Sequence, residues 1–301
     1  MNFLLYSAAV LVFGSAWLGI KYQLGVVAPE VSVAYRFVIA AAILFLYCLA
    51  ARLAMRFTLR EHAFMALQGL LLFSVNQFLI YLGTQYLASG LVAVAFSTIV
   101  VMNIGNGALI FRTSVPGRVT VGAALGLVGI TCVFWPEVRA FDLSRGGTLG
   151  LVLVLAGTYL ASLGNMAAMR NQARGLPVMQ CMTYAMAYGA LFTVFIALAR
   201  GQPFIFDPSL KYSLSLVYVA VITTAFGFWC YLTLLGRIGA ARTAYSAVLY
   251  PIVALALSTA FEGFRWTVLT VVGLVFILGG NILVLTRTDG AMTGAAPKGS
   301  I

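Results

Sequence analysis

The sequence is poor in acidic side chains and in histidine, and this scarcity removes most enzymatic chemistry. Only seven of its 301 residues are Asp or Glu, and one is His. His62 stands at the start of a long apolar stretch, at the wrong depth to be the base of an intramembrane serine protease. The acidic residues all fall near the ends of apolar stretches or between them: Glu30, Glu61, Glu137, Asp142, Asp207, Glu262 and Asp289.

The placement of the carboxylates excludes further classes of membrane protein. An intramembrane aspartyl protease needs two buried aspartates, and a prenyl-transfer enzyme needs clustered aspartates to hold magnesium and a diphosphate. Neither pattern occurs, and the chain has no GxxxxGK[ST] phosphate-binding loop. Ion-coupled carriers usually keep an ionisable group at membrane depth, where no carboxylate lies here. We therefore expect no enzyme, and we expect facilitated movement of a solute down its gradient.

Metal-binding and nucleic-acid-binding patterns are missing as well. The four cysteines, Cys48, Cys132, Cys181 and Cys230, lie far apart inside apolar stretches without a nearby histidine. We expect them to pack as small apolar side chains, and we expect no metal and no cofactor. The net charge of +11 does not indicate nucleic acid, because Lys and Arg stand singly between apolar stretches and form no patch.

Apolar residues are what the sequence has in excess. They make up 62% of the chain and charged residues only 8%, whereas soluble domains carry about 25% charged residues. A helix that spans a bilayer needs about 20 mostly apolar residues. The sequence predicts an all-α polytopic membrane protein with ten transmembrane helices, at about residues 3–21, 31–51, 62–82, 89–111, 118–136, 147–169, 178–199, 212–235, 240–261 and 266–286.

The distribution of Lys and Arg predicts the orientation of these helices. With the N-terminus inside, eleven of these residues fall on the cytoplasmic side and seven, Arg36 among them, on the outer side. Positive residues gather on the cytoplasmic side of membrane proteins with short loops. We therefore expect both termini in the cytoplasm. Residues 288–301 are small, polar and rich in Gly, and we expect a disordered tail there.

The two halves of the sequence resemble each other. Gly122 and Gly129 in the fifth predicted helix match Gly273 and Gly280 in the tenth, 151 positions later. Because five helices per half is an odd number, the second half must enter the membrane from the opposite side. Transporters use such a 5+5 inverted repeat for alternating access to a central site. We predict two five-helix domains, at residues 1–138 and 147–287.

Uncharged polar and aromatic side chains inside the predicted helices are the candidates for a solute path. In the third helix Ser74, Gln77, Tyr81 and Gln85 are spaced by three or four residues and share one face. Bonding between helices is the alternative role for each such residue. Because they occur in both halves, we predict that they line one central cavity. The predicted substrate-binding residues are Trp17, Asn76, Gln77, Tyr81, Asn103, Asn106, Asn165, Trp229, Ser246 and Tyr250.

The composition of this cavity indicates the kind of solute. Aromatic walls add about 0.5–1.5 kcal/mol for each stacked ring pair beyond simple burial. Without fixed negative charge, the cavity suits neutral, zwitterionic or aromatic solutes better than metal ions or bare cations.

Particular residues in both halves resemble a known family. They are Gly14-Ser15-Ala16-Trp17 and Lys21, Tyr35-Arg36-Phe37, and, in the second half, Gly239, Ala240, Tyr250-Pro251, Glu262, Gly273 and Gly280. With the ten-helix count, this pattern resembles the drug/metabolite transporter (DMT) superfamily, its EamA type, over about residues 3–286. Within the superfamily it is most similar to the YddG-type exporters of aromatic and other amino acids. The first half departs from the pattern, with Phe111 and Val100 at the positions of Glu262 and Pro251.

The resemblance implies a function that the residues alone leave open. It implies an exporter of amino acids and related metabolites in the inner membrane of a bacterium, with a small-molecule substrate, the lipid bilayer as surroundings and no nucleic-acid partner. A multidrug or quaternary-amine exporter of the same superfamily is one alternative. A membrane subunit without a transport cycle is another, and the absence of large soluble loops disfavours it.

Overall fold

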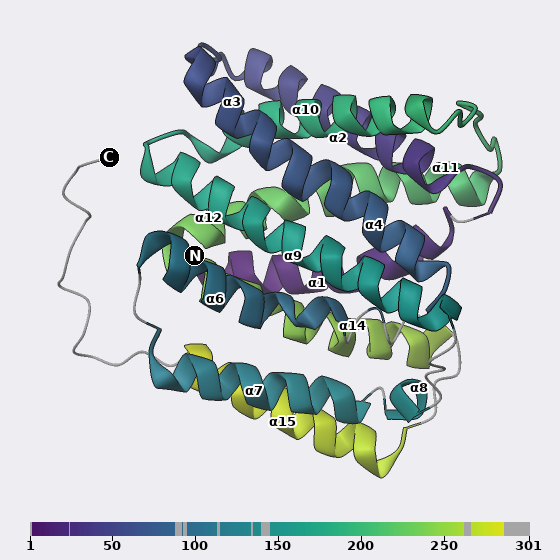
Figure 1. Ribbon diagram of the computed structural model, residues 1–301, viewed down its shortest axis with the longest axis vertical. Helices are drawn as coiled ribbons and strands as arrows, with labels where there is room; N and C mark the ends of the chain where they lie inside the picture. The colour runs from purple at the N-terminus through teal and green to yellow at the C-terminus, as the bar shows by residue number, and fades with distance from the viewer. Residues whose placement is uncertain are drawn as a thin grey trace.

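The computed structural model describes residues 2–23, 25–87, 92, 95–112, 115–133, 135–139, 145–261 and 266–285. In these ranges the chain consists of helices with short connections, and no strand occurs in them. The helices run roughly alongside one another in one bundle (Figure 1). The tail predicted at residues 288–301 and Glu262 lie outside the described residues, and so does the side chain of Trp17.

The helices of the first half end at a short helix that follows the fifth long segment. They are α1 (Asn2–Lys21), α2 (Pro29–Ala50), α3 (Leu59–Gln68), η1 (Gly69–Ser74), α4 (Val75–Thr84), α6 (Ile99–Phe111), α7 (Gly117–Val133) and α8 (Trp135–Arg139). The helices of the second half are α9 (Arg145–Ala173), α10 (Val178–Ala199), α11 (Leu210–Tyr218), η2 (Val219–Phe226), α12 (Gly227–Ile238), α13 (Ala240–Ala244), α14 (Ser246–Phe261) and α15 (Val268–Leu285).

These elements form the ten long segments that the sequence predicts. The third segment is α3, η1 and α4 in one continuous run, and the eighth is α11, η2 and α12. Five helices are long and apolar enough to cross a bilayer: Pro29–Ala50, Leu59–Thr84, Gly146–Ala173, Val178–Ala199 and Leu210–Ile238. Shorter apolar helices add Asn2–Ala16, Ala95–Phe111, Gly117–Val133 and Val268–Val284. The prediction of an all-α, ten-helix membrane fold is confirmed.

Local sequence signals explain where several helices begin. Pro29 stands in the first turn of α2, where its missing N–H costs nothing. Thr58 and Glu61 form a capping box at α3: the backbone N of Thr58 donates to Glu61 Oε2 at 2.6 Å, and the backbone N of Glu61 donates to Thr58 Oγ1 at 3.3 Å. Gly239 separates α12 from α13 with φ of +84°, a value that glycine adopts readily.

An irregularity recurs at the same place in both halves. The π-helix η1 interrupts the third segment, and the π-helix η2 interrupts the eighth. The offset of 151 positions between Gly122 and Gly273, applied to Gly69–Ser74, falls within Val219–Phe226. Such wide turns occur mostly as single turns inside α-helices, often at functional sites. The two halves therefore share a local distortion as well as a helix order.

Reciprocal glycine contacts join the last helix of each half. A Cβ on Gly129 would lie 2.7 Å from the carbonyl oxygen of Gly273, and a Cβ on Gly273 would lie 2.5 Å from that of Gly129. Gly122 and Gly280 face each other in the same way, at 2.8 and 2.6 Å. The order of these pairs makes α7 and α15 antiparallel, and Figure 1 shows them side by side along one edge of the bundle. This two-fold relation is that of an inverted repeat.

The remaining helices pair across the two halves. α1 packs against α12 and α14, α2 against α10 and η2, and α4 against α9. Each of these pairs joins the first half to the second. The space that the pairs enclose is therefore built from both halves, as the predicted central cavity requires.

Candidate substrate-binding site

A cavity of about 100 Å³ lies between α1, α2, α4, α6, α9, α12 and α14. One water needs roughly 10–15 Å³ measured in this way, so the cavity has room for a small molecule or several waters. Aliphatic residues such as Ala16, Ile20 and Ala247 supply part of the wall. Both halves contribute to the wall, which places the cavity where a repeat-built transporter has its substrate site.

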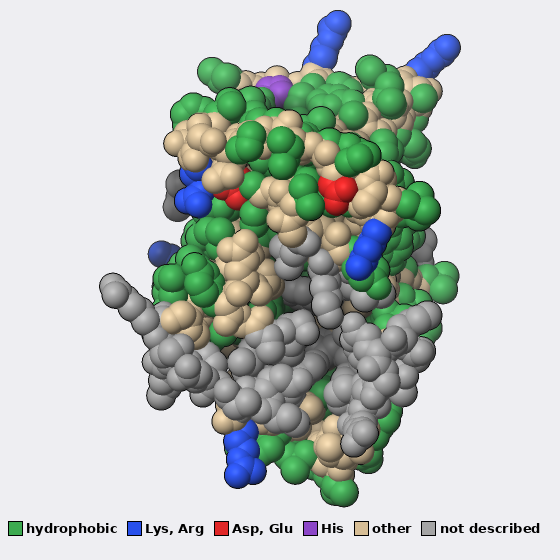
Figure 2. Space-filling model, turned by 90° about the vertical axis from the view of Figure 1, so that its right-hand side faces the viewer, with side chains coloured by type: hydrophobic (Ala, Val, Ile, Leu, Met, Phe, Trp, Pro, Cys, Tyr) green, Lys and Arg blue, Asp and Glu red, His purple; other side chains and the backbone are tan. Residues whose placement is uncertain are grey.

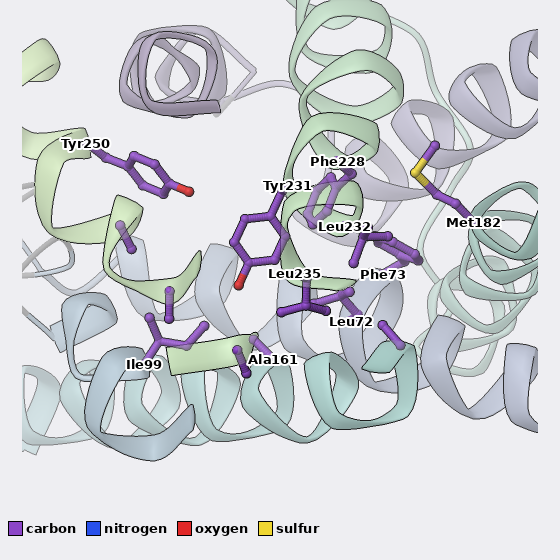
Figure 3. Packing of buried hydrophobic residues seen from close by; sticks show 14 of the residues in the cluster. Leu72, Phe73, Ile99, Ala161, Met182, Phe228, Tyr231, Leu232, Leu235 and Tyr250 are labelled. Carbon is purple, nitrogen blue, oxygen red and sulfur yellow. The ribbon is translucent and has the colours of Figure 1, made fainter. Parts of the chain in front are cut away.

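Aromatic rings make up one side of the cavity. Phe13 of α1 lies 5.1 Å from Phe228 and 5.4 Å from Tyr250 between ring centroids, and 6.1 Å from Tyr231. Figure 3 shows the rings of Tyr231 and Tyr250 projecting from α12 and α14 toward the same space, with Phe228 next to Tyr231. Phe96 of the fourth segment completes the aromatic lining. Such rings favour flat or aromatic groups at edge-on and offset contacts.

Amide and hydroxyl groups face the same space. The Nδ2 of Asn76 donates to the carbonyl oxygen of Gly157 at 3.3 Å, and the Nδ2 of Asn165 donates to the hydroxyl of Tyr231 at 2.9 Å. Both Oδ1 atoms are buried and have no hydrogen-bond partner among the described residues, and the same holds for the hydroxyl of Tyr81. A buried polar atom without a partner costs about 1–3 kcal/mol. These atoms are therefore available to a ligand or to water.

Arg36 also lines the cavity, although its place near the start of an apolar stretch predicts an outer, topology-setting charge. It lies two turns inside α2 and is only 3% exposed. Its Nε donates to Thr224 Oγ1 at 2.5 Å, and its Nη1 donates to Gln77 Oε1 at 3.4 Å. A single Arg near the start of an apolar stretch looks the same in sequence whether it faces headgroups or the interior.

Five of the predicted site residues line the cavity: Asn76, Gln77, Tyr81, Asn165 and Tyr250. The lining does not include four others, Asn103, Asn106, Ser246 and Trp229.

Two of the residues outside the lining, Asn103 and Ser246, bond to residues that form it, whereas Asn106 bonds to a residue that does not line the cavity. Asn103 accepts a bond from Asn165 Nδ2 at 3.5 Å and donates to the carbonyl oxygen of Ala240 at 3.5 Å. Asn106 donates to Ser162 Oγ at 2.9 Å. The hydroxyl of Ser246 lies 2.9 Å from that of Tyr250. These three residues therefore bond to neighbouring groups of the protein, which is the alternative role named for such residues.

The remaining predicted residue with a described side chain, Trp229, packs against the core. Its ring is half-buried and lies 6.0 Å from that of Phe226. The predicted shared face of the third helix holds for Gln77 and Tyr81, which line the cavity, and is wrong for Ser74 and Gln85. Ser74 is buried away from the cavity and accepts a bond from Thr193 at 2.9 Å, and Gln85 is exposed. The wide turn of η1, which ends at Ser74, breaks the regular spacing on which that prediction relied.

The cavity lies toward one end of the bundle. It reaches Ile20 near the end of α1 and Thr84 at the end of α4, close to where α2 begins. Figure 2 looks onto this end of the bundle. At the other end of the cavity, Phe73 and Phe228 are 4.9 Å apart between ring centroids, and Asn165 bonds to Tyr231. The side toward α3 and α13 is closed by these contacts.

The site holds no acidic group in the part of the chain that the structure describes. No Asp or Glu whose side chain the structure describes lines the cavity, and no group of three or more His, Cys, Asp or Glu that could hold a metal occurs among the described residues. The chemistry of the lining is therefore that of recognition, through rings, amides, hydroxyls and one guanidinium.

The EamA-like transporter family matches this chain twice, over residues 2–135 and 148–286. The chain belongs to that family. This EamA-like transporter is therefore a multi-pass membrane protein of a transporter family and not an enzyme. A small-molecule substrate is implied by the family, and the central cavity is the place in the fold that can hold one.

Two further comparisons agree with this assignment. A protein of Clostridium kluyveri, named only as an uncharacterized transporter, is 23% identical to this EamA-like transporter over 232 residues, which are 76% of this chain and 74% of the relative. One solved crystal structure matches 94% of this chain and 96% of its own with a TM-score of 0.75 at 16% identity. The likeness to that structure shows the shared fold.

Proposed function

We propose that this protein exports amino acids, the aromatic and other neutral ones, by alternating access and without coupling to an ion gradient. In this proposal it lies in the inner membrane of a bacterium with both termini in the cytoplasm. The cavity would take its solute from the cytoplasm in one state and release it outside in the other. The family assignment supports transport of a small molecule.

The observation that carries the proposal is the pair of amide oxygens in the cavity. The Oδ1 atoms of Asn76 and Asn165 lack partners among the described residues and stand beside the aromatic wall. An ammonium group is a donor of three hydrogen bonds, which suits two free acceptors. The rings of Phe13 and Tyr250 suit an apolar or aromatic side chain. Acceptors beside rings fit the two ends of a neutral amino acid.

The proposed orientation assigns the state of the transporter. With cytoplasmic termini, α2 begins and α4 ends at the outer surface, so the cavity reaches toward the outside. The contacts Phe73–Phe228 and Asn165–Tyr231 then close the cytoplasmic side. In export these contacts must separate to admit the next solute. Phe73 and Phe228 come from different halves, which supports a motion of one half against the other.

A second candidate is export of flat organic cations, and the aromatic wall favours it. A cation over a ring gains about 0.5–2 kcal/mol. The guanidinium of Arg36 in the same cavity opposes it, because like charges repel in a medium of low dielectric constant. We therefore rank cation export below amino-acid export.

The test is transport by the purified protein in liposomes. We expect counterflow of radiolabelled phenylalanine, threonine and methionine, with a rate that an imposed pH gradient leaves unchanged. Tyr81→Phe removes only a hydroxyl that lines the cavity, and we expect it to slow phenylalanine counterflow. Tyr47→Phe is the matched control, because Tyr47 is exposed on α2. Counterflow of tetraphenylphosphonium without any amino-acid counterflow would replace this proposal by the second candidate.

A further inference from the structure

Arg36 carries a buried positive charge that the described part of the protein leaves without a negative partner. Its two hydrogen bonds go to neutral groups, Thr224 Oγ1 and Gln77 Oε1. None of the three carboxylates whose side chains the structure describes contacts it. Glu30 pairs with Arg200 at 2.8 Å, Glu61 caps α3, and Asp207 accepts from the backbone of Ser209.

A buried charge without a negative partner destabilises the protein unless a ligand supplies that partner. The effective penalty for removing a charge from water inside a protein is several kcal/mol. Ionisable residues inside membrane-spanning segments accordingly face cavities and mark substrate paths. Arg36 fits that description, because it is buried in the bundle and lines the cavity. The side chain is also held in place, since Thr224 and Gln77 bind it from η2 and α4.

The guanidinium still has donors to offer. An arginine side chain carries five N–H groups, and the hydrogen bonds to Thr224 and Gln77 use two of them. A planar guanidinium binds a carboxylate through two parallel hydrogen bonds, which are shorter and stronger than neutral ones. A ligand carboxylate at this point would also neutralise the buried charge.

We propose that Arg36 binds the carboxylate of the transported solute and so makes the carrier selective for carboxylate-bearing substrates. The inference rests on the proposed function, which it deepens by assigning the polar end of the substrate. The carboxylate lies at Arg36, the ammonium group at the free oxygens of Asn76 and Asn165, and the side chain among the rings of α1, α12 and α14. The carrier therefore discriminates against ligands that keep the ring and the amine but lack the carboxylate.

A ligand series on the unmodified protein is the first test. Counterflow of radiolabelled phenylalanine is measured with three competitors: unlabelled phenylalanine, phenylalaninol and phenylalaninamide. The last two retain the ring and the amine and lack the carboxylate. A charged hydrogen-bonded pair is worth about 1.5–3 kcal/mol, so we expect phenylalanine to compete roughly ten- to a hundredfold better than either analogue. Equal competition by all three overturns the inference while leaving amino-acid transport intact.

Variants of Arg36 provide the second test. We expect Arg36→Gln to weaken competition by phenylalanine and to leave competition by phenylalaninol nearly unchanged. The preference for phenylalanine over phenylalaninol should then fall to about threefold or less. Arg36→Lys keeps the charge and should keep part of the discrimination. Lys211→Gln is the matched control, because Lys211 is an exposed cation at the same end of the bundle. If Arg36 had a purely structural role, its substitution would weaken competition by all three ligands alike, and that outcome overturns the inference.

Two outcomes separate this inference from the proposed function. Absence of counterflow with every amino acid removes the proposed function. If such a protein still carries 3-phenylpropionate, and Arg36→Gln abolishes it, the carboxylate site stands without the amino-acid assignment. If Arg36→Gln does not give a folded protein in detergent, the ligand series on the unmodified protein and on Arg36→Lys decides the matter.

Discussion

Asn165 donates a 2.9 Å hydrogen bond to the hydroxyl of Tyr231, and this bond ties α9 to α12 where the cavity is closed. Asn103 extends the contact through its 3.5 Å bond with Asn165. The three side chains come from α6, α9 and α12. Their contact therefore bridges the two halves of the protein at the position where an alternating-access cycle has to open.

Removal of this bond should loosen the closed side. Polar contacts between membrane helices are worth about 0.6 kcal/mol on average and up to about 1.7. We expect Tyr231→Phe and Asn165→Ala to interact in a double-mutant cycle by about that amount, because each variant removes the same bond. The measurement is the free energy of unfolding of the four proteins in detergent. Strictly additive effects of the two substitutions would show that the bond contributes nothing.

The glycines between α7 and α15 should tolerate no side chain. A Cβ on Gly129 would lie 2.7 Å from one backbone oxygen and 2.9 Å from the backbone N of Ile277. We expect Gly129→Ala to lower the midpoint of thermal unfolding, because backbone on both sides must separate. Gly105→Ala is the control, since a Cβ there meets no atom within 4 Å and alanine favours a helix by about 1 kcal/mol over glycine. A more stable Gly129→Ala protein would contradict the packing described here.

The ion pair between Glu30 and Arg200 should respond unequally to loss of either partner. The Glu30 side chain is 2% exposed and that of Arg200 is 49% exposed. Arg200→Gln leaves a buried carboxylate without its cation, and we expect a loss of about 1–3 kcal/mol in the free energy of unfolding. Glu30→Gln leaves an arginine that can turn to water, and we expect a loss below about 1 kcal/mol. Denaturation of both variants in detergent measures the difference, and equal losses would contradict it.

Thr224 should position Arg36 for its ligand. Thr224→Val removes the acceptor of the Arg36 Nε bond and preserves the shape of the side chain. We expect the half-saturation concentration for phenylalanine to rise about three- to tenfold with little change for phenylalaninol. Thr131→Val is the control, because the Thr131 hydroxyl bonds only within α7, to the carbonyl oxygen of Leu127 at 2.9 Å. An equal rise for both ligands would assign Thr224 to general packing instead.

The sequence predicts the helices and the pairing of the halves well, because both depend on patterns along the chain. Apolar stretches of sufficient length mark the segments, and the repeated glycines mark the contact of α7 with α15. The predicted boundaries of the domains and the predicted orientation stay predictions.

The cavity was harder to predict, because its lining depends on which way each helix is turned. The sequence predicts Arg36 as a topology-setting charge, since nothing along the chain shows that Thr224 and Gln77 bind it from two other helices. Asn103 and Ser246 are uncharged polar residues inside apolar stretches, as Asn76 is. Only Asn76 lines the cavity, whereas the other two bond to residues that line it. Ser74 was misplaced because the wide turn at η1 has no clear signature in its residues.

The two π-helices have a further consequence for motion. One residue corresponds to about 100° of rotation around an α-helix, and a π-turn is an α-turn with one residue added. If such a turn shifts along its helix, the residues it passes rotate by that angle while both ends of the helix stay where they are. Leu72 lies in η1 and lines the cavity, and Thr224 lies in η2 and holds Arg36. In each half, a shift of the π-turn could therefore rotate one side chain, Leu72 in the cavity wall or Thr224 beside Arg36. Such a rotation requires no lengthening, tilting or withdrawal of the helix from the bilayer.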